Sequence, residues 1–346
     1  MTTKVKKTGH RKDPIIYQEA SLILRQGGLV AFPTETVYGL GANGLDAEAV
    51  NKIYEAKGRP QDNPLILHIA EVKQLFGLVK SVPLLAETLM KYFWPGPLTL
   101  VFQKNDKIPA EASGGLQTIA IRQPAHPVAL ELVREAGVPV AAPSANIAGR
   151  PSPTTANHVL HDLQGRVDMV IDGGQTNVGL ESTVVDVTGG VPVLLRPGAV
   201  TAEMLEAVIG RVVMDEGDNT HKDFKPKAPG MKYKHYAPQA EVSIVRGQLE
   251  AVVEAIRDLS GAADNRVGIL ATTQTAHCYN SERNVVLVAG DRNHPETIAA
   301  NLFAMLRLFD DYGVRIVYAE SLPEPGLGYA IMNRLIKAAD HRVIEV

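Results

Sequence analysis

The fold of this chain is constrained most by one break in its hydrophobic pattern. Across residues 213–240 the regular spacing of apolar residues disappears, and three prolines interrupt a stretch rich in Asp and Lys. Since a single core stops growing at roughly 250–300 residues, a chain of 346 residues is expected to form two domains. We therefore predict one domain over residues 15–212, a linker over 213–240 and a second, smaller domain over 241–346.

The first predicted domain contains both strand-like and helix-like segments. Its apolar runs have the length of buried strands, and helical spacing fills several of the intervals between them. Two strands follow each other directly late in the domain, which indicates an α/β fold with a mixed sheet. The predicted strands are 29–32, 65–69, 98–102, 118–122, 138–142, 169–172, 183–187 and 193–196, and the predicted helices are 15–25, 46–56, 83–92, 127–136 and 201–209.

The second predicted domain alternates more strictly. A regular alternation of strands and helices is typical of a parallel sheet covered by helices. This region is therefore predicted to form a small parallel α/β domain. Its predicted strands are 242–245, 267–270, 285–288 and 316–318, and its predicted helices are 248–259, 296–310 and 328–339.

Composition indicates a cytoplasmic protein with no membrane association. The single cysteine, Cys278, excludes an intramolecular disulfide and a cysteine-based zinc cluster, which fits a reducing compartment. Residues 1–14 carry several Lys and Arg residues but no apolar stretch, so they are predicted to be a disordered tail rather than a secretory signal. No run approaches the ~18 apolar residues of a membrane span.

Several well-known motifs are absent. No Gly-Lys is followed by Ser or Thr, so a nucleotide would have to be held without a P-loop. Residues 39–44 match the dinucleotide glycine pattern, but six residues separate them from the strand that should lead into it, and tight backbone turns are the preferred interpretation. Neither Gly-x-Ser-x-Gly nor His-Glu-x-x-His occurs, which excludes the hydrolase classes that carry them.

A basic loop follows the predicted helix 46–56. Lys57 and Arg59 flank a glycine, and Asn63 follows on a proline-stiffened segment. A lysine point charge, a planar guanidinium and an amide on one loop suit a polyphosphate. Cations at the end of a helix also complement the helix dipole, so both interpretations remain open.

A second polar loop follows the predicted strand 138–142. Ser144 and Asn146 come first, and Ser152 follows on a proline-rich segment. Ligands of open α/β sheets gather beyond the carboxyl ends of strands, although Ser and Asn are also ordinary turn formers. Ser182 and Arg196 lie beside the ends of further predicted strands in the same way.

Three polar residues interrupt apolar strand signals. Thr36 follows the buried strand 29–32 and is suited either to a small polar ligand or to a strand. His68 lies inside an apolar strand, as a ligand contact or as a core histidine. Arg122 ends another apolar strand, and we expect an anion beside it because burying an unpaired cation is costly.

The linker contains a basic and aromatic segment, residues 227–238, which includes Tyr236. Such a segment serves either as a plain tether or as a lid. Its composition favours a lid that stacks on a base and touches phosphates, since long loops in compact proteins are commonly functional.

In their order and spacing these segments resemble the YrdC-like family, in particular its two-domain form. The resemblance covers about residues 15–240, and the C-terminal region matches by position and by its α/β pattern. It implies a YrdC-like open, twisted mixed sheet with helices, followed by a smaller Rossmann-like domain. The residues that carry it are Phe-Pro-Thr-Glu-Thr-Val-Tyr-Gly-Leu-Gly from Phe32, Lys-Gly-Arg-Pro from Lys57, Asn-Pro-Leu from Asn63, Trp-Pro-Gly-Pro-Leu-Thr from Trp94, Ala-Ala-Pro-Ser-Ala-Asn from Ala141, Glu-Ser-Thr-Val from Glu181 and Leu-Arg-Pro-Gly from Leu195.

The resemblance implies a nucleotidyltransferase, an L-threonylcarbamoyladenylate synthase. Its substrates would be ATP, L-threonine and bicarbonate, with Mg²⁺ bound through the ATP phosphates and no metal held by protein ligands alone. Downstream proteins would transfer the threonylcarbamoyl group to tRNA beside the anticodon. By motif, ATP would be bound by Lys57, Arg59, Asn63, Thr118, Ser144, Ser152, Arg196 and Tyr236, threonine by Thr36, His68, Arg122, Ala142 and Ser182, and the catalytic set would be Lys57, Arg59, Ser144 and Asn146.

Three other functions are alternatives to the synthase, and a sequence feature argues against each of them. An RNA-binding YrdC-like module without adenylating activity is the main alternative, and a weak RNA contact is compatible with both functions, but aromatic residues make up only 5% of the chain. A hydrogenase-maturation carbamoyltransferase would need zinc fingers, which one cysteine cannot form. A dinucleotide enzyme built on the second domain would need a glycine fingerprint that its first turn, residues 245–248, lacks.

Overall fold

The computed structural model describes residues 2–8, 13–215, 226, 235–280 and 282–346. The chain forms two compact units. The first consists of Met1–Ala148 and Ser152–Tyr233, and the second of Lys234–Val346 together with the short segment Gly149–Pro151.

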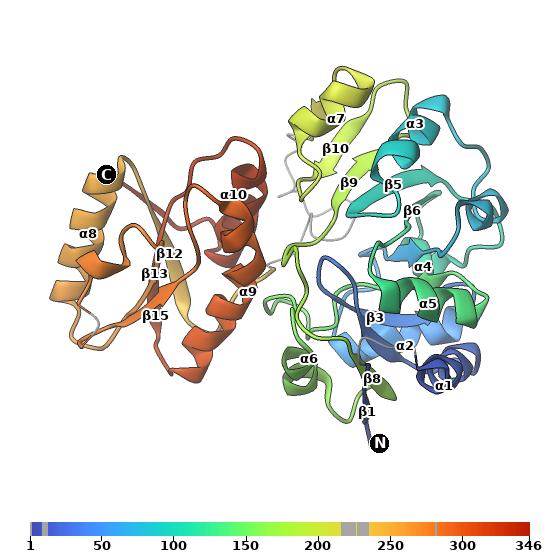
Figure 1. The fold of residues 1–346 in the computed structure, drawn as a ribbon, viewed down its shortest axis with the longest axis horizontal. Coiled ribbons are helices and arrows are strands. Elements are labelled where there is room, and N and C mark those ends of the chain that lie inside the picture. The colour runs from blue at the N-terminus through green and yellow to red at the C-terminus, as the bar shows by residue number, and fades with distance from the viewer. Residues whose placement is uncertain (1, 9–12, 216–225, 227–234, 281) are drawn as a thin grey trace. The chain divides into compact units, whose positions relative to one another are not determined.

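The first unit is built on a sheet of eleven described strands (Figure 1). The sheet is mixed, as the sequence predicts. Five strand pairs are parallel and five antiparallel. The strands lie in the order β1 (Lys4–Lys7), β8 (Met169–Asp172), β2 (Val30–Pro33), β3 (Tyr38–Asn43), β7 (Val140–Ala141), β4 (Ile66–His68), β6 (Thr118–Arg122), β5 (Leu98–Gln103), β9 (Thr183–Asp186), β10 (Val193–Arg196) and β11 (Val213–Met214).

Helices cover both faces of this sheet, and strand β2 shows how. Val30 and Phe32 pack in one core with α1 (Pro14–Arg25) and α5 (Pro127–Ala136). Ala31 packs in a separate core with α2 (Ala47–Lys57), because successive side chains of a strand point to opposite faces. The remaining helical segments of this unit are η1 (Val72–Gly77), α3 (Leu84–Phe93), α4 (Ala110–Ser113), α6 (Ala156–Leu163) and α7 (Ala202–Ile209).

Strand β1 corrects one prediction. Residues 1–14 were expected to form a disordered tail, but Lys4–Lys7 pairs in parallel with β8. Its residues contribute mainly backbone hydrogen bonds, and Lys4 and Lys6 form ion pairs with Glu19 of α1. Charged residues with little apolar content are typical of edge strands, which explains why no hydrophobic pattern indicates this one.

Strand β3 corrects a second prediction, that the glycines at 39–44 form tight turns. Most of this segment is a strand that pairs antiparallel with β2. A side chain at Gly41 would place its Cβ only 2.8 Å from both Phe32 and Val140. The glycine is therefore needed for close packing of neighbouring strands, and the segment does not have the strand-to-helix geometry of a dinucleotide fingerprint.

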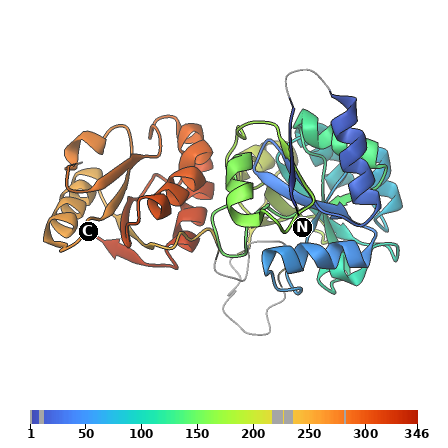
Figure 2. The same cartoon turned by 90° about the horizontal axis from the view of Figure 1, so that it is seen from below.

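The second unit has a five-stranded sheet, which is entirely parallel, as predicted (Figure 2). Helix α8 (Leu249–Ala262) lies on one face, and α9 (Pro295–Asp311) and α10 (Leu327–Ala338) lie on the other. A short segment, η2 (Ala276–Cys278), follows the second strand along the chain. The strand order is β14 (Val285–Val288), β13 (Gly268–Ala271), β15 (Ile316–Glu320), β12 (Glu241–Arg246) and β16 (Val343–Glu345).

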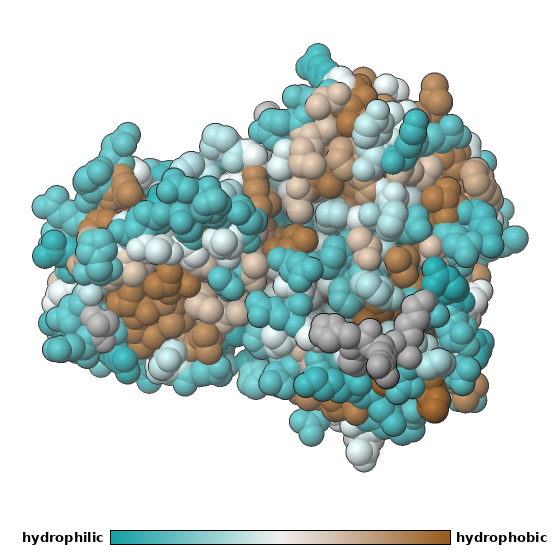
Figure 3. Space-filling model, viewed as in Figure 1, coloured by the Kyte–Doolittle hydropathy of each residue, from teal (hydrophilic) through white to brown (hydrophobic). Residues whose placement is uncertain are grey.

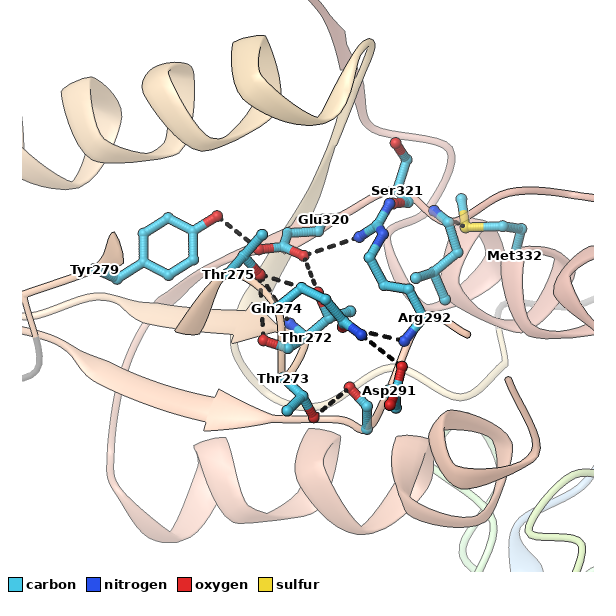
Figure 4. A network of polar contacts seen from close by, with 12 residues as sticks. Thr272, Thr273, Gln274, Thr275, Tyr279, Asp291, Arg292, Glu320, Ser321 and Met332 are labelled. Atoms are coloured by element: carbon cyan, nitrogen blue, oxygen red, sulfur yellow. Dashed lines mark hydrogen bonds and ion pairs between the residues drawn. The ribbon is translucent and has the colours of Figure 1, made fainter. Parts of the chain in front are cut away.

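A buried polar network joins the loops that follow three of these parallel strands (Figure 4). Glu320 at the end of β15 accepts hydrogen bonds from the Tyr279 hydroxyl at 2.7 Å and from the Thr272 hydroxyl at 2.9 Å. Arg292 donates to the same carboxylate at 3.0 Å and to the carbonyl of Ser321 at 2.7 Å. Both oxygens of this buried carboxylate are therefore hydrogen-bonded.

The turn after β12 in this unit is closed. A Cβ at Gly247 would lie 2.3 Å from the carbonyl oxygen of Val346, which packs against it. In a dinucleotide-binding fold the pyrophosphate approaches the backbone at the corresponding turn. The packing of Val346 therefore agrees with the missing glycine fingerprint.

The visible surface carries mostly hydrophilic side chains, with apolar side chains gathered in separate areas (Figure 3). The longest described helix, α9, has 17 residues. No helix in the described part of the chain is long and apolar enough to cross a membrane.

Candidate active site

A buried ion pair lies beside the loop between β2 and β3. Arg122, the last residue of β6, donates from Nη1 to the Thr36 hydroxyl at 2.9 Å and from Nε to the carbonyl of Gly96 at 3.1 Å. Its Nη2 lies 2.6 Å from Glu35 Oε1, and the two side chains are only 4% and 11% exposed. Glu35 is thus the anion that the sequence predicts beside Arg122.

The hydroxyl of Thr36 is oriented by its neighbours. Thr34 Oγ1 lies 2.7 Å from the carbonyl of Val37, to which it donates its only proton. The contact of 2.8 Å between the Thr34 and Thr36 hydroxyls must then use the proton of Thr36. Because Arg122 also donates to Thr36, this hydroxyl can offer a ligand only a lone pair.

His68 lies beside Arg122, since the two residues are paired in the register of β4 and β6. Its ring meets Phe32 edge-on at 6.3 Å between centroids. Burial, together with the charge of Arg122, lowers the pKa of His68 to about 3. The imidazole is therefore neutral at physiological pH, and it can offer or accept a hydrogen bond without carrying charge.

Two buried polar atoms near this ion pair have no partner among the described residues. They are Oε2 of Glu35 and Nδ1 of His68, whereas Oε1 of Glu35 and Nη2 of Arg122 face each other in the ion pair. Buried polar atoms are nearly always hydrogen-bonded in native proteins, so such a group indicates a position that a ligand fills. The site thus holds a buried carboxylate and a buried guanidinium side by side, which complements a zwitterion.

A lysine cluster lies at the end of α2. Asp46 caps this helix, accepting from the backbone of Glu48 at 3.0 Å, and the helix ends at Lys57. The Lys57 side chain is buried, and its ammonium donates to the carbonyls of Ser144 and Asn146. The Ser144 hydroxyl donates to Asn146 Oδ1 at 2.6 Å. The structure thus brings together three of the four residues of the expected catalytic set.

Arg59, the fourth residue of that set, lies on the loop after α2. Its Nη2 donates to the carbonyl of Asn63 at 3.3 Å and to that of Pro64 at 3.1 Å. The Asn63 side chain is buried, and its Oδ1 has no hydrogen-bond partner in the described residues. Thr118 begins β6, and its side chain makes no hydrogen bond to another described residue, so no contact joins it to this group.

The loops around β9 hold the remaining candidates. The Ser182 hydroxyl is 2.7 Å from that of Thr99, and Arg196 donates to the Ser182 hydroxyl at 3.1 Å and to its carbonyl at 3.0 Å. The Ser152 hydroxyl donates to the carboxylate of Glu181, the residue before Ser182. Arg196, Ser182 and Ser152 are therefore close together.

Backbone hydrogen bonds join these clusters to one another. The amide of Gly179 donates to the carbonyl of Thr36 at 3.0 Å, and that of Ala145 donates to the carbonyl of Tyr38 at 2.8 Å. Ala142, a predicted threonine contact, is tied to β4 through the carbonyl of Ile66 at 2.9 Å. Apart from Thr118, the predicted residues of the first unit therefore belong to one set of connected loops and strand ends.

Thr176 is a candidate that the sequence did not indicate. It lies on the loop between β8 and β9, its amide donates to the carbonyl of Thr154 at 3.0 Å, and its side chain is 3% exposed. Its hydroxyl has no hydrogen-bond partner among the described residues. The only sequence signal was the polar, glycine-rich character of this loop, which does not single out one threonine.

Tyr236 is the one predicted site residue that belongs to the second unit. There its ring stacks on Phe303 at 5.2 Å, and the Arg334 guanidinium lies 5.5 Å from its centroid. Of the expected lid, residues 227–234 lie outside the described residues. The prediction that this segment closes over ATP therefore stays a prediction.

Comparison with known proteins places this site in a family. A family model described as "Telomere recombination", which covers the Sua5, YciO and YrdC proteins, matches residues 22–198. A second model, the C-terminal domain of threonylcarbamoyl-AMP synthase, matches residues 200–340. The threonylcarbamoyl-AMP synthase of Bacillus subtilis is 52% identical over 96% of this chain and 95% of its own length.

The chain belongs to the threonylcarbamoyl-AMP synthase family. The synthase of Pyrococcus abyssi is 49% identical over 94% of this chain and 95% of its own length. The crystal structure of P. abyssi Sua5 with L-threonine matches with a TM-score of 0.94 and 48% identity, over 99% of this chain and 100% of the other. The resemblance and the two-part fold predicted from the sequence are confirmed, and the comparisons support a synthase rather than an RNA-binding module.

Proposed function

We propose that this member of the synthase family converts L-threonine, bicarbonate and ATP into threonylcarbamoyl-AMP and pyrophosphate. The observation that carries the proposal is the buried Arg122–Glu35 ion pair, with Oε2 of Glu35 and Nδ1 of His68 left without partners beside it in the described residues. An amino acid zwitterion offers a carboxylate to the guanidinium and an ammonium to the carboxylate. The wider set of loops then supplies the cations that a nucleoside triphosphate needs.

The threonine pocket is proposed around Arg122. The carboxylate of threonine pairs with Nη2 of Arg122, because a guanidinium binds carboxylates in a fixed fork geometry. His68, as a neutral imidazole, contributes a hydrogen bond from Nδ1 or to it. Thr36, Ala142 and Ser182 complete the pocket.

The ATP pocket is proposed beside it. The phosphates interact with Lys57, Arg59 and Arg196, and Ser144, Asn146 and Ser152 lie on the loops tied to these cations. Arg196, a proposed ATP contact, donates directly to Ser182, a proposed threonine contact, so the two pockets adjoin. This adjacency suits the attack of a carbamate oxygen on the α-phosphate. Asn63, Thr118 and Tyr236 remain proposed ATP contacts on the resemblance alone.

Magnesium is proposed to enter with ATP. Among the described residues, no group of three or more His, Cys, Asp or Glu side chains could hold a metal ion. The acidic groups of the site are engaged, since Glu35 pairs with Arg122 and Glu181 accepts from Ser152. The phosphates would therefore be the main ligands of Mg²⁺, which would neutralise negative charge on the α-phosphate and on the leaving pyrophosphate.

The product is a reactive acyl phosphate anhydride. Threonylcarbamoyl-AMP must be consumed by an acyl transfer, and we propose that separate proteins pass the group to an adenosine of tRNA beside the anticodon. The resemblance supports this last step, which concerns partners of the chain.

One assay tests the proposed function. Pyrophosphate release from ATP and magnesium is measured while threonine or bicarbonate is omitted in turn. We expect release only when both are present, and we expect Arg59→Ala to reduce it strongly. Arg211→Ala, which changes an exposed arginine outside the site, is the matched control. Release that ignores both omissions, or no release at all, contradicts the proposal.

A further inference from the structure

We propose that Glu35 is a catalytic residue of this reaction, which receives the ammonium group of threonine and accepts its proton. This inference rests on the proposed function. It assigns the step that turns threonine into a nucleophile.

The reaction requires such a step. An amino acid at neutral pH carries an ammonium group, which has no lone pair. The nitrogen must lose a proton before it can attack the carbon of bicarbonate. A proton acceptor within hydrogen-bond reach of the ammonium is therefore needed in the pocket.

Most other groups near Arg122 are poor acceptors. His68 would become a buried cation beside the Arg122 guanidinium if it took a proton, and both burial and the charge of Arg122 lower its pKa, whereas a protonated Glu35 is neutral. His126 has a lowered pKa through burial, and its Nδ1 already accepts from the amide of Val128 at 3.2 Å. Glu181 accepts a hydrogen bond from the Ser152 hydroxyl. Glu35 is the remaining carboxylate next to the guanidinium.

The surroundings of Glu35 fit an ammonium. The side chain is 11% exposed, its Oε1 forms the ion pair with Arg122, and its Oε2 has no hydrogen-bond partner among the described residues. The adjacent Thr36 hydroxyl can only accept, because its own proton is used by Thr34. Two acceptor positions, Oε2 of Glu35 and the Thr36 hydroxyl, thus lie beside Arg122, where the carboxylate of the same amino acid would bind.

Threonine binding itself would activate Glu35. Although burial opposes ionisation, the Arg122 guanidinium holds the pKa of Glu35 below its usual value. A bound carboxylate shares that guanidinium and adds a second negative charge beside Glu35. Both changes raise the pKa of Glu35 and make it a better proton acceptor.

The chemistry balances as follows. Glu35 takes a proton from R–NH₃⁺, and the freed lone pair forms a C–N bond to the carbon of bicarbonate while one C–O bond breaks. The net reaction of R–NH₃⁺ with HCO₃⁻ gives R–NH–COO⁻, one water and one proton. The proton leaves through the carboxyl of Glu35, which retains slight exposure to solvent.

The test compares pH profiles of kcat/KM for threonine, followed by pyrophosphate release. We expect Glu35→Gln to lose roughly a hundredfold at neutral pH, as for loss of a general base. The loss should shrink as the pH rises toward the pKa of the threonine amino group, because solution then supplies the neutral amine. Glu19→Gln is the matched control, since Glu19 pairs with Lys4 outside the site, and it should leave the profile unchanged.

The outcomes separate the inference from the proposed function. A wild-type protein that releases no pyrophosphate in response to threonine and bicarbonate defeats the function itself. An active wild type with a Glu35→Gln variant within twofold of it, or equally impaired at every pH, overturns only the role of Glu35. Glu35→Asp keeps the charge, and its pH profile can be measured instead if Glu35→Gln folds poorly. It should retain the wild-type pH profile at a reduced kcat, and a Gln-like profile would overturn the proposal.

Discussion

The two units each contain a buried Arg–Glu pair, and the pairs differ in how they are completed. In the second unit, both oxygens of Glu320 accept hydrogen bonds, from Tyr279, Thr272 and Arg292 (Figure 4). In the first unit, Oε1 of Glu35 lies 2.6 Å from Nη2 of Arg122, but Oε2 has no hydrogen-bond partner in the described part of the chain. The same two residue types thus form a fully hydrogen-bonded network in the second unit and one that leaves a buried acceptor unsatisfied in the first.

The difference distinguishes a structural pair from a binding site. Leaving one buried polar group unpaired costs about 1–3 kcal/mol, so an unfinished network is retained only where something else completes it. Glu320 and Arg292 tie together the loops after three parallel strands and need nothing further. Glu35 and Arg122 are completed by a ligand with opposite charges at its two ends.

The largest effect is expected from Arg122→Met. Removing one partner of a buried charge pair costs about 2–5 kcal/mol, so we expect kcat/KM for threonine to fall by roughly a hundredfold or more. Stability should fall as well, because Glu35 is left buried without its cation. Trp94 is the only tryptophan of the chain and lies in the first unit, so its fluorescence reports unfolding of that unit. A variant with unchanged threonine kinetics would contradict the assignment of Arg122.

Arg292→Met should give the opposite pattern. We expect the second unit to lose about 3–5 kcal/mol, since Glu320 becomes an unpaired buried charge. Far-UV circular dichroism should detect the loss, whereas kcat per folded molecule and the Trp94 transition should not change. Adding Glu320→Gln to this variant removes the unpaired charge and should restore part of the stability. A large loss of kcat in Arg292→Met would mean that the second network also serves the reaction.

The sequence predicts this architecture well wherever the signal is local. Asp46 and the apolar spacing after it specify α2, and the uninterrupted apolar runs specify most strands of both units. The requirement for an anion beside Arg122 also followed from the sequence, because an arginine at the end of an apolar strand must be paired. These features depend on neighbours along the chain or on a general energetic rule.

What the sequence could not supply depends on distant partners. Gly41 belongs to a strand because Phe32 and Val140 approach it, and no local pattern contains that contact. Strand β1 is held mainly by backbone hydrogen bonds to β8, which leave no apolar signature. Thr176 is distinguished only by an unpaired hydroxyl in the folded protein. The identity of Glu35 as the partner of Arg122 likewise needed the fold.

The first unit is also expected to lose stability in acid, by an amount between those of the variants above and those below, because His68 lies buried beside Arg122. The pKa of His68 falls from 6.5 to about 3 on folding, so the folded protein resists a proton that the unfolded chain accepts. The neutral histidine therefore contributes stability above pH 6.5 that is lost as the pH falls toward 3. By pH 5 the loss is about 2 kcal/mol. Urea unfolding followed by Trp94 at pH 7 and pH 5 should show this decrease, and His68→Gln should show a smaller one.

The smallest expected effects come from two isosteric changes, Thr272→Val and Thr176→Val. The Thr272 hydroxyl donates to Glu320 at 2.9 Å, so its loss should destabilise the second unit by about 1.5 kcal/mol. The Thr176 hydroxyl has no partner among the described residues, so replacing it with a methyl group should leave the Trp94 transition unchanged or slightly raised.

Substrate kinetics distinguish these two variants further. If a substrate hydrogen-bonds to the Thr176 hydroxyl, Thr176→Val should raise KM for threonine or ATP several-fold while the stability of the protein is unchanged. Thr272→Val should lower the stability and leave both KM values unchanged. Equal loss of stability in the two variants would mean that Thr176 has a structural partner, and the unpaired hydroxyl would then no longer mark a ligand position.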